Sequence, residues 1–151
     1  MIIHNNRTWI MKMLLVAGAV EILVGFLHFV MPNFALKSPG FNLLNGSEID
    51  FISSGVYAVG ILLVAFGSLT IAVSLVPDKR KGLLLPFLVI KSFLWSGRIG
   101  LELLFPVTIP IYHFHRPTTI IMPLLVFETL LFIVPMVYVW AKKGTLEGYL
   151  V

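Results

Sequence analysis

Six ionisable side chains stand inside long apolar runs of this sequence, where they could do chemistry. A charge at the centre of a membrane helix costs roughly 2.5–3.5 kcal/mol by insertion scales, so such side chains normally face a protein interior and find partners. Acids, cations and a histidine in an apolar setting can bind the polar group of an apolar ligand or move its protons. With a nearby tryptophan they form our candidate ligand-binding set: Glu21, His28, Lys91, Trp95, Arg98, Glu102 and Glu128.

The depth of each residue predicts which of these side chains meet. Counted from the basic residues that precede their apolar runs, at about 1.5 Å per helical residue, Glu21 lies about 14 Å deep and Lys91 about 15 Å deep. Opposite charges at one depth, on polar sides of two helices, should pair. We therefore expect a buried ion pair between Glu21 and Lys91.

The same count places a second group nearer the opposite surface. It gives about 24 Å for His28 and about 26 Å for Arg98, and it places Glu102 highest; counted back from Lys142, which follows the fourth run, Glu128 lies about 21 Å deep. A guanidinium can serve two acceptors at once. We expect Arg98 to bridge Glu128 and to come close to His28 and Glu102.

One further pattern is a His-x-His in a proline-rich segment. In an extended segment His113 and His115 would point to one face, and His28 or Glu102 could add a third ligand for zinc, copper or iron. A His-x-His in a loop is more often ordinary surface chemistry, so we expect no metal. The chain has no cysteine, which excludes thiolate metal sites, disulfides and thiol redox relays.

The elements that must position these side chains are membrane helices. The chain is 58% hydrophobic and 12% charged over 151 residues, whereas a soluble domain carries roughly 25% charged residues. Its mean hydropathy is +0.99. Such a chain has room for four crossings of about 20 residues. We expect an all-α integral membrane four-helix bundle, a single domain over residues 1–151, with spans at about 11–30, 51–76, 83–105 and 118–140.

Small and polar residues recur at helical spacing along one side of the first three expected spans, and the fourth has a single acid among apolar residues at the same spacing. In lipid, packed helix faces are marked by such residues, because apolar side chains gain nothing by leaving the lipid. We expect these sides to face one another. They comprise Gly18, Glu21, Gly25, His28 and Pro32 in the first span; Ser53, Tyr57, Gly60, Val64, Gly67, Ile71 and Ser74 in the second; Lys91, Trp95, Arg98 and Glu102 in the third; and Ile121, Leu125, Glu128, Phe132 and Pro135 in the fourth.

Two connections carry their own signals. Residues 32–50 form a loop that ends in Ser47-Glu48-Ile49-Asp50, a capping-box pattern that predicts the start of the second helix. Residues 106–117 hold three prolines, which prevent a regular helix. We expect this second segment to be a lid over a polar pocket that opens outward.

The basic residues predict the orientation of the chain. Seven flank the spans on one side and two on the other, and the side rich in Lys and Arg is normally cytoplasmic. We therefore expect both termini in the cytoplasm and an uncleaved first helix in the inner (plasma) membrane. The basic residues form no stripe with interleaved aromatics, so we expect no nucleic-acid binding. The seven are Arg7, Lys12, Lys79, Arg80, Lys81, Lys142 and Lys143, and the two are Lys37 and Arg116.

The run from Glu21 to Pro32, with Gly25 and His28 inside it, resembles the small four-helix bacterial membrane proteins of the DoxX-like group. The loop and the Gly/Ser-rich second span that follow fit the same group. The resemblance implies a role linked to quinones, in sulfur oxidation or membrane redox defence. A second similarity is to four-span sterol-isomerase and sterol-binding proteins, which also keep acids and a histidine in an apolar cavity.

These observations lead to one expected function and two alternatives. We expect a redox-associated membrane component whose buried Glu/His/Lys/Arg cluster binds a quinone-, sterol- or lipid-like ligand. An intramembrane isomerase that uses acid/base chemistry is one alternative, and a structural subunit of a larger membrane complex or homo-oligomer is the other. No phosphate loop, serine elbow or His-Glu-x-x-His motif is present in the sequence, so the question of enzymatic activity stays open.

Overall fold

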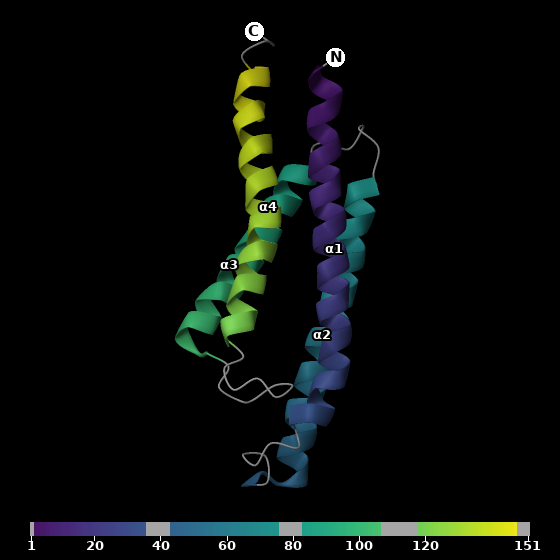
Figure 1. The fold of residues 1–151 in the computed structure, drawn as a ribbon, viewed down its shortest axis with the longest axis vertical. Helices are drawn as coiled ribbons and strands as arrows, with labels where there is room; N and C mark the ends of the chain where they lie inside the picture. Colours follow the sequence, from purple (N-terminus) through teal and green to yellow (C-terminus); the bar gives the residue numbers. More distant parts are fainter. Residues whose placement is uncertain (1, 36–42, 76–82, 107–117, 148–151) are drawn as a thin grey trace.

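The protein is all-α and has four long helices (Figure 1). The computed structural model describes residues 2–35, 43–75, 83–106 and 118–147. The helices are α1 (Ile2–Ala35), α2 (Gly46–Leu75), α3 (Leu84–Leu104) and α4 (Thr118–Glu147). Each holds a stretch long and apolar enough to cross a membrane: Trp9–Asn33, Gly46–Leu75, Leu84–Leu104 and Thr118–Ala141. The expected four-span helical membrane protein, in contact with the bilayer, is confirmed at this level.

The helices pack as two pairs that meet along α1 and α4. Helix α1 packs along α2 and α3 packs along α4, while α1 and α4 form a third, smaller interface. In Figure 1 the two pairs lie closest in the upper part of the view and diverge below it. In the described part of the chain α2 and α3 approach each other far less. The four helices therefore form an open arrangement, in which the side between α2 and α3 is joined mainly by side chains.

Glycines allow the closest of these interfaces. Gly18 faces Gly67 and Gly25 faces Gly60, and a Cβ atom built on any of the four would lie 2.6–2.9 Å from the carbonyl oxygen of the glycine opposite. No side chain fits there, so the backbones of α1 and α2 touch directly. This is the small-residue packing that membrane helices favour. The middle parts of the stripes predicted for the first two spans, from Gly18 to His28 and from Gly60 to Ile71, are confirmed as the α1–α2 interface.

The apolar side chains divide between a narrow core and a broad outer surface. Leu14, Leu88, Leu125 and Phe132 are buried within the core. Many other large apolar side chains are exposed along all four helices. In water such a surface would drive aggregation, whereas in a bilayer it is the expected contact with lipid.

Helix α2 begins two residues earlier than the capping pattern predicted. The Asn45 side-chain oxygen accepts hydrogen bonds from the Glu48 amide at 3.0 Å and from the Ser47 hydroxyl at 2.7 Å. In return, the Asn45 amide donates to the Glu48 carboxylate at 2.8 Å. This reciprocal pair makes Asn45 the N-cap and Glu48 the third helical residue. Asparagine caps at least as well as serine, so the expected box of Ser47 and Asp50 is wrong.

Candidate functional site: a buried charged cluster between the helices

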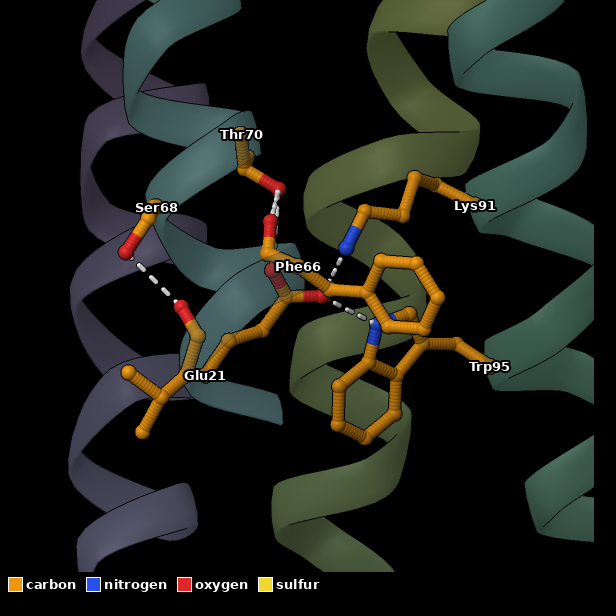
Figure 2. A network of polar contacts seen from close by, with 7 residues as sticks. Glu21, Phe66, Ser68, Thr70, Lys91 and Trp95 are labelled. Atoms are coloured by element: carbon orange, nitrogen blue, oxygen red, sulfur yellow. Dashed lines mark hydrogen bonds and ion pairs between the residues drawn. The ribbon is translucent and has the colours of Figure 1, made fainter. Parts of the chain in front are cut away.

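The carboxylate of Glu21 lies at the centre of a buried polar network (Figure 2). Its Oε1 atom accepts hydrogen bonds from Lys91 Nζ at 2.5 Å and from Trp95 Nε1 at 2.8 Å. Its Oε2 atom lies 2.9 Å from the hydroxyl oxygen of Thr70. Glu21 is only 1% exposed. Three helices, α1, α2 and α3, thus contribute to one ion pair, and the predicted contact between Glu21 and Lys91 is confirmed.

Aromatic rings surround the ammonium group of Lys91. Its Nζ atom lies 5.1 Å from the ring centre of Phe66, 5.3 Å from that of Phe132 and 6.0 Å from that of Phe87. The negative face of an aromatic ring attracts a cation, most strongly where water is excluded. These rings come from α2, α4 and α3. Their attraction helps the Lys91 ammonium to stay buried on the side of the protein between α2 and α3.

Glu128 on α4 brings a second acid to the same cation. Its side chain is 0% exposed, and neither carboxylate oxygen has a hydrogen-bond partner among the described residues. The charges of Lys91 and Glu21 both act on it. We name Glu21, Thr70, Lys91, Trp95 and Glu128 the Glu21 cluster. Fully ionised, its two carboxylates and one ammonium would leave one negative charge in surplus, and a buried unpaired charge costs several kcal/mol.

The Arg98 side chain bonds within its own helix. It donates a hydrogen bond to Glu102 at 2.9 Å, and the Thr118 hydroxyl donates to the other oxygen of Glu102 at 3.2 Å. The expected approach of Arg98 to Glu102 is confirmed. The expected bridge from Arg98 to Glu128 is wrong, because Glu128 has no such partner.

The reason lies in the level of Glu128 along α4. The bond between Thr118 and Glu102 sets the start of α4 level with the end of α3. From there Glu128 lies about 15 Å along α4 and Lys91 about 16 Å along α3, whereas Arg98 lies about 6 Å along. The sequence-based count started from the basic residues near the end of α4, but that helix continues to Glu147. Glu128 therefore belongs with Lys91.

The histidines take no part in the Glu21 cluster as described. The ring of His28 donates to the Val24 carbonyl of its own helix at 2.8 Å, and its Cβ atom faces Gly60 across the α1–α2 interface. His113 and His115 lie outside the described residues. Within the described ranges, no group of three His, Asp or Glu side chains could hold a metal ion.

Sequence reasoning missed two members of this region, Thr70 and Phe66. Thr70 is fully buried and bonds Glu21, although the predicted stripe passed through Ile71 instead. A signal was present: Thr70 lies three residues after Gly67 and four before Ser74, which is equally good helical spacing. Phe66 carries no such signal, because its aromatic ring resembles many that face lipid.

A surface depression lies away from the Glu21 cluster. It is open, has a volume of about 390 Å³ and lies at the start of α2, lined by Leu44, Ser47, Glu48, Phe51 and Ile52. Most of the segment expected to form a lid, residues 107–117, lies outside the described residues. All five side chains of the Glu21 cluster are buried.

The helices and the cluster together define a class: a four-span helical membrane protein with a few buried charged residues. No known protein family, no curated protein and no solved structure matches the chain. Its function is therefore inferred from the chemistry of the cluster.

Proposed function

We propose that the protein binds a small, largely apolar molecule inside the membrane, and that a hydroxyl group of this molecule donates a hydrogen bond to Glu128. The buried carboxylate of Glu128, without a partner among the described residues, carries this proposal. Leaving a buried acceptor unsatisfied costs about 1–3 kcal/mol, so a donor brought by a ligand gains this energy. Quinol-, sterol- and lipid-like molecules all combine an apolar body with such a hydroxyl.

The ligand reaches the cluster from the lipid, between α2 and α3. These helices approach each other little, and the Phe66 ring lies next to the Lys91 ammonium and over part of the Trp95 side chain in the view of Figure 2. Phe66 is 40% exposed, so its outer side faces the bilayer. A change in the rotamer of this one ring would open a lateral path for an apolar molecule.

The resemblance of the first span to the DoxX-like group favours a quinol among these ligands. A redox-associated role in the inner membrane, with both termini in the cytoplasm, belongs to the same proposal. The proposal also includes a single domain over residues 1–151. Of the predicted ligand-binding residues, Lys91 and Trp95 hold the Glu21 carboxylate in place, and Glu21 in turn holds the Lys91 ammonium beside the bound hydroxyl. His28, Arg98 and Glu102 would contact the part of the ligand nearer the ends of α3 and α4.

Two other roles start from the same unpartnered acid. A donor from another membrane protein or from a second copy of this chain could meet Glu128, which would make the protein a structural subunit. An intramembrane enzyme could use Glu128 as an acid or base on an apolar substrate. The ligand-binding role is preferred because the aromatic rings of Phe66 and Phe132 already form apolar walls around Lys91.

Native mass spectrometry of the detergent-purified protein tests the proposal with Glu128→Leu. We expect the wild type to retain a small apolar molecule and Glu128→Leu to lose it, while thermal stability stays equal or rises, because leucine removes a buried polar group without a partner. Thr129→Val is the matched control, since the Thr129 hydroxyl bonds only within α4, to the Leu125 carbonyl, in the described structure. This control should retain the molecule.

Two results would count against ligand binding. One is a wild-type protein that carries no small molecule after mild extraction, and the other is equal retention by wild type and Glu128→Leu. A stoichiometric protein partner that Glu128→Leu loses would instead support the subunit role.

A further inference from the structure

The hydroxyl of Thr70 lies between two acceptors and has one proton to give. Its oxygen is 2.9 Å from Glu21 Oε2 and 2.7 Å from the Phe66 carbonyl oxygen one turn earlier in α2. Both distances are those of good hydrogen bonds. A hydroxyl donates one hydrogen bond and accepts others. Thr70 therefore cannot donate to both oxygens at once, and the protonation of Glu21 decides which bond forms.

Both protonation states of Glu21 are fully bonded in this geometry. When Glu21 is ionised, Thr70 donates to Oε2. When Oε2 carries a proton, that proton is donated to the Thr70 oxygen, and Thr70 donates to the Phe66 carbonyl. Trp95 donates to Oε1 in either state. The switch requires only that a proton binds to Oε2 and that the Thr70 O–H bond turns from Oε2 to the Phe66 carbonyl.

The charges around Glu21 require a proton on one of the two acids. Lys91 from α3 and Glu128 from α4 are the titratable groups that act on it, and α2 contributes the neutral Thr70. One ammonium balances one carboxylate, so the cluster is neutral when the other acid is protonated. Glu128 has no partner in the described structure and is buried, which makes it the better place for that proton at rest.

We propose that Glu21 and Glu128 form a proton-binding site inside the membrane and share one exchangeable proton. At rest the proton is on Glu128. When Glu128 is ionised, for example to accept a hydrogen bond from a ligand hydroxyl, its O–H bond breaks and an O–H bond forms at Glu21 Oε2. Lys91 keeps its charge throughout, so the net charge of the cluster is unchanged. The site needs no ligand, and the inference goes beyond the proposed function.

Infrared spectroscopy of the ligand-free protein tests the inference, because a protonated carboxylic acid has a carbonyl stretch separate from those of carboxylates and amides. We expect the wild type to show a buried-acid band that is lost in Glu128→Gln and also in Glu21→Gln, because in each variant the one remaining acid balances the Lys91 ammonium as a carboxylate. Lys91→Met removes the cation, so Glu21 should take up a proton. A second band of similar area should then appear and should be absent from the double variant Lys91→Met/Glu21→Gln.

The hydroxyl of Thr70 provides the decisive control. Adding Thr70→Val to Lys91→Met should move the Glu21 band to higher frequency, because the acid loses its acceptor, while Thr70→Ser should leave the band in place. The inference is overturned if Lys91→Met gives no second band, if Thr70→Val does not move it, or if Lys91→Met fails to fold. Ligand retention is not measured in these experiments, so their failure is separate from failure of the proposed ligand site.

Discussion

The ion pair between Glu21 and Lys91 is buried at a point where neither charge could remain alone. Glu21 receives three polar contacts, and Lys91 is further surrounded by three aromatic rings. Breaking a buried pair by removing one partner usually costs more than replacing both, since the remaining charge is left uncompensated.

A double-mutant cycle measures this coupling. We expect Glu21→Gln and Lys91→Met each to destabilise the protein. The sum of the two single losses should exceed the loss in the double variant by a coupling energy of about 1–3 kcal/mol. Glu128 can ionise beside Lys91 in Glu21→Gln, and Glu21 can take up a proton in Lys91→Met, so the coupling energy stays below that of an isolated pair. Thermal unfolding of all four proteins in one detergent gives the result. Strictly additive losses would contradict the pairing.

The sequence predicted this pair but not the whole cluster. Equal depth and opposite charge were enough to join Glu21 with Lys91. Glu128 was assigned to the wrong level, because α4 extends beyond the basic residues from which its depth was counted. Thr70 was missed although its helical spacing from Gly67 and Ser74 is as good as that of Ile71, because the choice between the two depends on how α2 is rotated about its axis.

At the scale of the helices, the α1–α2 interface depends on the absence of side chains at four glycines. A Cβ atom at position 67 would lie 2.6 Å from the Gly18 carbonyl oxygen and 2.7 Å from a side-chain carbon of Ile22. The first contact is with backbone, which cannot turn away as a side chain can. Helix α1 would have to shift, and Glu21 would shift with it.

We therefore expect Gly67→Ala to destabilise the protein by about 1–3 kcal/mol, the usual cost of overpacking. Gly97→Ala is the matched control, because nothing lies within 4 Å of a Cβ atom at that position of α3. There alanine should be neutral or stabilise by up to about 1 kcal/mol, through its higher helix propensity. Thermal unfolding in the same detergent compares them. Equal effects of the two substitutions would refute direct backbone contact at Gly67.

Helix bounds show where pattern reading succeeds and where it stops. The spans at 83–105 and 118–140 begin within one residue of α3 and α4, because the flanking segments hold turn and proline signals. Helix α1 begins nine residues before the predicted span, and α4 ends seven residues after it. Hydropathy reports the part inside lipid, whereas a helix can continue into water for as long as its backbone hydrogen bonds are made. Pro32, Pro123 and Pro135 lie within helices, as membrane helices tolerate.

At the scale of the whole molecule, the open arrangement of the helices explains why the cluster is both buried and reachable. Helices α1 and α4 contact each other and join the two helix pairs. Helices α2 and α3 flank them and have little direct contact with each other. Side chains such as Phe66 and Lys91 close the remaining side. A contact made by side chains can open more easily than one made by packed backbones, so this side is where exchange with the lipid would take place.

The orientation of the molecule in the membrane is the last prediction. The start of α1 and the end of α4 lie at the same end of the structure (Figure 1), so both belong to one side if all four helices cross. Seven Lys and Arg residues flank the spans at that end and two at the other, which predicts that it is cytoplasmic. The chain has no cysteine, so each introduced cysteine reports alone.

Leu43, next to the start of α2, and Leu83, next to the start of α3, are both exposed and lie at opposite ends. A membrane-impermeant maleimide applied to intact cells should label Leu43→Cys and leave Leu83→Cys unlabelled. Permeabilised cells should show labelling of both, which controls for reactivity. Labelling of Leu83→Cys alone in intact cells would reverse the orientation, and labelling of both would mean that the four candidate spans do not all cross the membrane.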